Sequence, residues 1–183
     1  SLANTGLIEI DGGAVLAVDG RLKNDGILIG TGAIVGNLLN NGIDNPGGLG
    51  TQTVAGNYDQ TAAGMLVLDF ASDDSLGLLD SLGIAGRATL AGTLEIDFVD
   101  GFTAVAGDRF TILTAFGGVF GNFDTFHFAS LAPGLAWTEQ VNGDEVQLDV
   151  VGTAPEPSTF ALLLPTLLGV AWWSSRRRRK LIG

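Results

Sequence analysis

The single histidine of this chain, His127, is the natural place to look for catalytic chemistry. Asp124 and Ser130 lie within three residues of it, so the side-chain types of a serine-hydrolase triad are present. In an extended strand, however, side chains alternate between two faces, which places Asp124 with Phe126 and Phe128 and turns His127 to the other side. We therefore expect His127 to be a half-buried structural residue and the chain not to be an enzyme.

Metal and cofactor chemistry is weakly supported. The chain has no cysteine and one histidine, so a zinc cluster and a disulfide scaffold are both excluded. Calcium accepts carboxylates from loops, and Asp73–Asp74 and the pair Asp97 and Asp100 are the candidates. Neither follows the spacing of a known calcium loop, so we expect solvated turns, no metal and no cofactor.

The segments that would position such side chains alternate with a period of two, which is typical of strands buried on one side. The expected inward sets are Leu66, Leu68 and Phe70; Leu94, Ile96 and Phe98; and Val146, Leu148 and Val150. Residues 72–84 break this alternation and are expected to form a loop or a short amphipathic turn. With 28 glycines but no three-residue period, the composition indicates an all-β chain with many turns.

An Asn-x-Gly phrase recurs near the N-terminus, beginning at Asn4, Asn24 and Asn40, and each copy precedes an apolar run. Asn and Gly tolerate positive φ, so we interpret the phrase as turn chemistry. Spacings of 20 and 16 residues suit the coils of a parallel β-helix, or solenoid. A series of ordinary hairpins with Asn-Gly turns is the alternative.

The C-terminus combines a breaker, an apolar segment and a basic block. Pro155, Glu156 and Pro157 precede an uncharged run over residues 159–173, and Arg176, Arg177, Arg178, Arg179 and Lys180 follow two serines. As a helix, that run would rise about 22 Å against a hydrocarbon core of about 30 Å. We expect a short transmembrane helix over 159–175, with the basic tail 176–183 in the cytoplasm and the body outside it.

This tail resembles the PEP-CTERM protein-sorting signal, on the strength of these three features in this order over about residues 154–180. The resemblance implies a Gram-negative bacterium and an exosortase-type membrane protease as partner. Cleavage near Pro155, Glu156 and Pro157, which would be a substrate site, would release the body to the cell surface or an exopolysaccharide matrix. A permanently anchored single-span protein is the alternative.

Residues 57–150 resemble the passenger-associated β-helix segments of autotransporters, through glycine-then-strand phrases such as those at 58–70 and 88–102. The resemblance implies a β-helix body and is almost silent on activity. A glycan-active β-helix enzyme therefore stays open, although it would need an acid–base pair gathered in a groove. A structural or adhesive role at the surface, with exopolysaccharide as a partner, is the preferred interpretation.

The formal charge of −11 conceals two opposite parts. Residues 1–154 carry −15 and the last 29 residues carry +4, so the body would be repelled by nucleic acid. The expected organisation is a solenoid over 1–151, a linker over 152–158, the membrane helix and the basic tail. Because the chain starts mid-pattern at Ser1, we expect it to be the C-terminal part of a longer exported protein.

Overall fold

The computed structural model describes residues 1–71 and 79–153. Every regular element in these ranges is a β-strand, which confirms the prediction of an all-β chain. No helix long and apolar enough to cross a membrane occurs among the residues described. The strands are Leu2–Asn4 (β1), Leu7–Glu9 (β2), Val15–Asn24 (β3), Ile27–Ile29 (β4), Ala33–Asn40 (β5), Ile43–Asn45 (β6), Thr51–Val54 (β7), Tyr58–Gln60 (β8), Met65–Phe70 (β9), Ser81–Ile84 (β10), Ala88–Leu90 (β11), Thr93–Phe98 (β12), Arg109–Ala115 (β13), Val119–Gly121 (β14), Thr125–Phe128 (β15), Leu135–Asn142 (β16) and Glu145–Gly152 (β17).

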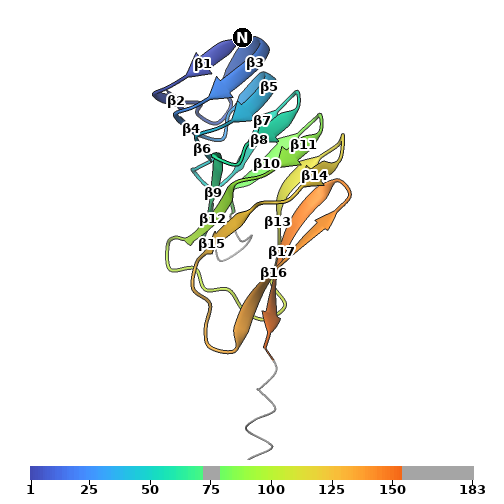
Figure 1. The fold of residues 1–183 in the computed structure, drawn as a ribbon. Helices are drawn as coiled ribbons and strands as arrows, with labels where there is room; N and C mark the ends of the chain where they lie inside the picture. Colours follow the sequence, from blue (N-terminus) through green and yellow to red (C-terminus); the bar gives the residue numbers. More distant parts are fainter. Residues whose placement is uncertain (72–78, 154–183) are drawn as a thin grey trace, which may run out of the picture. The chain divides into compact units, whose positions relative to one another are not determined.

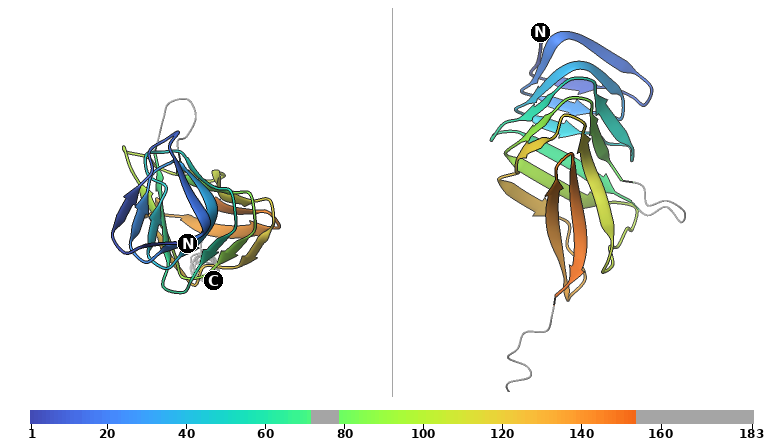
Figure 2. Two further views of the ribbon diagram at one scale, coloured as in Figure 1. Left: turned by 90° about the horizontal axis from the view of Figure 1, so that it is seen from above. Right: turned by 90° about the vertical axis from the view of Figure 1, so that its right-hand side faces the viewer.

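The strands β1 to β15 wind into successive coils that stack by parallel pairing (Figure 1). One side of the stack is a six-stranded sheet in the order β15-β12-β9-β6-β4-β2. The other two sides belong to one sheet, because β5 pairs with β7 through Ala33–Ile34 and with β8 through Leu38–Asn40. The views in Figure 2 show the resulting three-sided coils around a shared interior.

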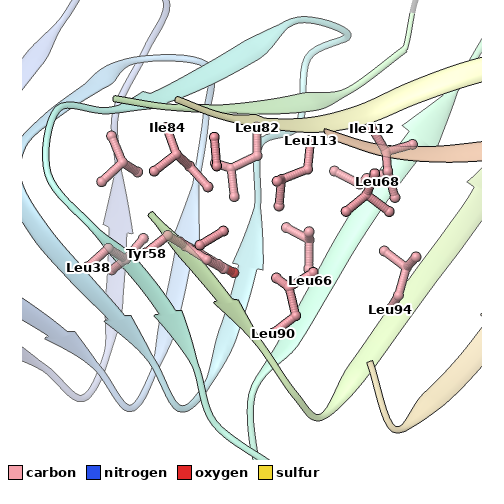
Figure 3. Packing of buried hydrophobic residues seen from close by; sticks show 14 of the residues in the cluster. Leu38, Tyr58, Leu66, Leu68, Leu82, Ile84, Leu90, Leu94, Ile112 and Leu113 are labelled. Carbon is pink, nitrogen blue, oxygen red and sulfur yellow. The ribbon is translucent and has the colours of Figure 1, made fainter. Parts of the chain in front are cut away.

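The interior is filled by the alternating apolar side chains that the sequence predicts to face inward. Leu66, Leu68, Leu94 and Ile96 are fully buried, and Val146, Leu148 and Val150 are buried on β17. Figure 3 shows Tyr58 lying among Leu38, Leu66 and Leu90, so residues from different coils meet in the same core. Burying each leucine contributes about 2 kcal/mol, so the coil stack is held mainly by this shared core.

The Asn-x-Gly phrases mark bends between strands, as expected, but a positive φ, which the interpretation assumed, occurs at none of their glycines or asparagines. The asparagines have a further role. Their side chains do not serve only as turn formers but lie buried in a column, where Asn24 is in register with Asn4 and Asn40. Asn4 Nδ2 donates to Asn24 Oδ1 at 2.8 Å, and Asn24 Nδ2 donates to Asn40 Oδ1 at 2.9 Å. Asn40 Nδ2 continues the column to Gln60 Oε1 at 3.3 Å. Each amide therefore links one coil to the next.

The glycines of these phrases are required by close approach between coils. A Cβ on Gly26 would lie 2.2 Å from the carbonyl oxygen of Gly6, and one on Gly42 would lie 2.2 Å from that of Gly26. Any other residue would push adjacent coils apart at this corner.

Residues 79–84 correct a second expectation. The sequence places a loop or turn over 72–84, whereas Ser81–Ile84 form β10 with Leu82 and Ile84 buried. The strand pairs in parallel with both β7 and β13, so it is an inner strand of the stack. The sequence did not predict β10, because Gly77, Leu78 and Leu79 disturb the alternation with a period of two just before this strand.

The last coil is covered by the antiparallel strands β16 and β17, of which β17 pairs with β13. Trp137 of β16 packs on the rings of Phe98, Phe110 and Phe128, with centroid distances of 5.9, 6.0 and 5.5 Å. The coils and this cap make up one compact unit, Ser1–Val151. The predicted membrane helix lies outside the described residues.

Candidate ligand-binding face

One outer face of the coil stack gathers most of the positive charge of the body. It is formed by the second half of β3 together with β5, β8, β11 and β14, and we call it the ligand face. Three of the four basic residues of residues 1–153 belong to it, namely Arg21, Lys23 and Arg87. Pairing register arranges its outward side chains in rows across the coils. One row contains Lys23, Leu39, Asp59, Thr89 and Phe120.

Asp59 stands between two arginines from different coils. Arg21 Nη2 lies 3.6 Å from Asp59 Oδ2, and Arg87 Nη2 lies 3.7 Å from Asp59 Oδ1. The two arginine side chains remain 51% and 55% exposed, so most of their donor groups face solvent. Exposed ion pairs of this length contribute little to stability, which leaves the guanidinium groups available to a ligand.

A second polar row links three coils through side chains. Lys23 Nζ pairs with Asp25 Oδ2 at 2.6 Å, Asn41 Nδ2 donates to Asp25 Oδ1 at 2.9 Å, and Thr61 Oγ1 donates to Asn41 Oδ1 at 2.7 Å. The hydrogen bonds from Lys23 and Asn41 lower the pKa of the Asp25 carboxyl below its ordinary value. Asp25 is therefore a carboxylate at neutral pH.

Asn37 and Asn57 fill the space between the two arginines along the edge of this face. Asn37 Oδ1 accepts from the Asn57 amide at 2.9 Å, and Asn57 Oδ1 accepts from the Arg87 amide at 3.0 Å. Their side chains fix the corner, while 55% of Phe120 is exposed at the far end of the face. Guanidinium, amide and carboxylate groups beside an exposed ring suit the hydroxyls and apolar faces of sugars. The structure therefore places all these groups on one outer face of the coil stack.

His127 lies on the outward side of β15, as the alternation predicts, but it pairs with a residue that the sequence did not suggest. Its Nδ1 is 3.3 Å from Glu95 Oε2 of the neighbouring strand β12. Asp124 accepts instead from the Gly92 amide, and Ser130 borders a hollow beside Phe98. With 58% of its side chain exposed, His127 is not half-buried as expected. These three residues do not form a catalytic group.

Of the acidic candidates for calcium, the structure describes Asp97 and Asp100. Asp97 is in register with Asp69 on the six-stranded sheet, and Asp100 lies beyond it at a positive φ of 51°. Burial, and then the charges of Asp80 and Asp97, raise the pKa of Asp69. Among residues 1–71 and 79–153, no group of three His, Cys, Asp or Glu side chains could hold a metal ion. Asp73 and Asp74 lie outside the described residues.

The sorting residues Pro155, Glu156 and Pro157, and the basic residues Arg176–Arg179 and Lys180, also lie outside the described residues. The ligand face was missed at the sequence level, because its residues come from five separate strands. Its signal was present in the coil spacing: Arg21, Asn37, Asn57 and Arg87 follow one another at intervals near those of the buried columns. Only the register reveals that they share a row.

No family model matches this chain, and no curated protein sequence matches it.

Proposed function

We propose that this chain is an exported bacterial surface or matrix protein, in which a β-solenoid body is followed by a PEP-CTERM-type sorting tail. A transmembrane helix over 159–175 would hold it in the inner membrane, with the body outside the cytoplasm, until an exosortase-type protease cuts near Pro155–Pro157. The observation that carries the proposal is the order of motif, apolar run and basic block over residues 155–180.

The body is proposed to have a structural or adhesive role towards exopolysaccharide. This part is supported by the ligand face, where Arg21 and Arg87 flank Asp59 and Phe120 is exposed. A face that extends across several coils suits a polymer, because several sugar units can contact its rows at the same time.

Sorting is tested by the intact mass of the protein recovered from the surface of cells that contain the protease. We expect the mass of a chain that ends near Pro157 and lacks Arg176–Arg179. A Glu156→Gln variant should retain the whole tail and stay with the membrane fraction, since the change alters the processing motif alone. Recovery of the uncut tail from the surface would instead favour a permanently anchored protein.

Adhesion is tested by binding of the purified protein to immobilised exopolysaccharide. The double variant Arg21→Gln, Arg87→Gln should bind about a hundredfold more weakly or worse, because hydrogen bonds from charged donors contribute about 1.5–3 kcal/mol each. Arg109→Gln is the matched control, since Arg109 lies off this face and pairs with Asp149 at 2.8 Å. Equal binding by both variants would remove the ligand face from the proposal. Shortening of the polymer would favour the enzyme alternative.

A further inference from the structure

A carboxyl group interrupts a column of leucines inside the coil stack. Asp44 of β6 is in register with Leu28 of β4 and with Leu66 of β9, and Leu66 is in register with Leu94. All four side chains are completely buried. Burying a carboxyl is costly, and the positions in register with it hold leucine, so the aspartate at this place requires a physical explanation.

Asp44 lacks the partners that a buried carboxylate needs. Neither of its oxygens has a hydrogen-bond partner within the described residues, and the same is true of Gln52 Oε1 on β7. Gln52 Nε2 donates to the Gly30 carbonyl at 3.2 Å, and the Tyr58 hydroxyl donates to Gln60 Oε1 at 2.8 Å. Three acceptor atoms therefore share this part of the interior without a donor.

No positive charge faces the group from the elements around it. Strands β4 and β9 present Leu28 and Leu66, and β7 and β8 present Gln52 and Tyr58. Tyr58 is titratable but neutral, because burial and then the charge of Asp44 raise its pKa well above the ordinary value. The basic residues of the described part pair elsewhere: Arg21 and Arg87 with Asp59, Lys23 with Asp25, and Arg109 with Asp149.

A proton on Asp44 resolves this shortage of donors. A neutral carboxylic acid has one O–H donor, which can serve Gln52 Oε1 and leave the other carboxyl oxygen as a weak acceptor. Burial of the carboxyl raises the pKa of Asp44 to about 7. The protonated form is thus the one that the interior favours.

We infer that Asp44 is a proton-dependent latch, which as a neutral acid donates to Gln52 Oε1 and ties β6 to β7 across the turn that joins them. That turn, residues 46–50, contains three glycines. Gly47 and Gly48 line a hollow of about 430 Å³ together with Glu9, Asp11 and Thr31. Leu49 has a positive φ of 56°, which is strained for a residue other than glycine. When Asp44 loses its proton, the buried carboxylate is stabilised by hydration, which favours opening of this turn to water.

The sign of the effect follows from the two pKa values. When the turn opens, Asp44 meets water and its pKa returns to about 3.8; when the turn is closed, the pKa is about 7. Between these values opening releases a proton, so the open fraction rises about tenfold per pH unit. Below pH 4 and above pH 7 the two states hold the same number of protons, and the response levels off.

Hydrogen exchange of the amides of residues 47–52, corrected for the intrinsic rate at each pH, tests the latch. From pH 5 to pH 7 we expect protection in the full chain to fall about a hundredfold, and then to stay level to pH 8.5. Asp44→Asn keeps the shape and an N–H donor for Gln52, so its protection should not vary with pH. Asp44→Leu completes the column of leucines, and its protection should also not vary with pH. The variant that folds better of the two provides the comparison with the wild type.

Asp80 is a second carboxyl at the same turn, and replacing it provides the control. Its Oδ1 accepts from the Gly50 amide at 3.1 Å, and burial also raises its pKa. The inference requires that Asp80→Asn retains the hundredfold response, and that the amides of residues 82–84 show none. It is overturned if the wild-type turn is insensitive to pH, or if the response disappears in Asp80→Asn but persists in Asp44→Asn.

Discussion

At the scale of single residues, the asparagine column shows how one side chain can join two coils. Asn24 Oδ1 accepts from Asn4, and its Nδ2 donates both to Asn40 Oδ1 and to the Ile43 carbonyl, the latter at 2.8 Å. All these groups lie in a dry interior, where an unpaired donor or acceptor costs about 1–3 kcal/mol. The column therefore penalises any change of register between coils.

Replacing Asn24 with alanine should destabilise the body strongly. The change leaves Asn4 Nδ2, Asn40 Oδ1 and the Ile43 carbonyl with fewer partners, so we expect a loss of about 2–4 kcal/mol in the free energy of unfolding. Urea denaturation followed by circular dichroism measures it. Asn122→Ala is the control, because this asparagine is exposed, and its effect should stay within about 0.5 kcal/mol. Equal losses would contradict a structural role for the column.

The glycines make a prediction of a different physical kind. Gly26→Ala places a Cβ 2.2 Å from the Gly6 carbonyl oxygen, whereas Gly6→Ala places one where no heavy atom lies within 4 Å. We expect the first to cost about 2–4 kcal/mol through forced separation of the coils, and the second less than about 1 kcal/mol. The two variants are compared by their midpoints of urea denaturation. They are matched, because each adds one methyl group and both changes lie near the same corner. A loss of stability in Gly6→Ala as large as that in Gly26→Ala would contradict this explanation. It would show that the conformational preference of glycine, and not close approach between coils, governs these positions.

At the scale of elements, the cap formed by β16 and β17 covers the last coil through aromatic packing. Trp137 donates from Nε1 to the Ala129 carbonyl at 3.1 Å while its ring packs against four phenylalanines. Trp137→Ala should lower the free energy of unfolding by about 3 kcal/mol and loosen the cap first. Phe116→Ala, at a side chain that is 86% exposed, should have little effect. Hydrogen exchange on β16 and β17 would detect the loosening, and unchanged protection there would contradict it.

The elements also show what the sequence could and could not predict. Strands β9, β12 and β17 were visible because one face of each is uniformly apolar, and burial follows that alternation. The role of Asn4, Asn24 and Asn40 was hidden, because the same residue type favours exposed turns and buried amide columns. The ligand face and the Asp44–Gln52 pair could not be predicted either, since both depend on which residues of different coils fall in register.

At the scale of the whole molecule, the chain divides its charge between an acidic body and a basic end. For the proposed transmembrane helix such a division would have a consequence for topology, because basic residues next to a span are retained on the cytoplasmic side. The body, with a formal −15, has little of this retention signal. Orientation of the whole protein would then depend on five residues at its end.

Replacing Arg176–Arg179 with glutamine tests that dependence. Without four of the five terminal charges, the 15-residue apolar run has no cytoplasmic anchor, so we expect the unprocessed chain to slip out of the membrane and appear in the soluble exported fraction. Fractionation followed by intact mass measures both location and length. A matched variant with all four changed to lysine keeps the charge and should remain membrane-bound until it is cut. Retention of the glutamine variant in the membrane would mean that the apolar run alone is a sufficient anchor.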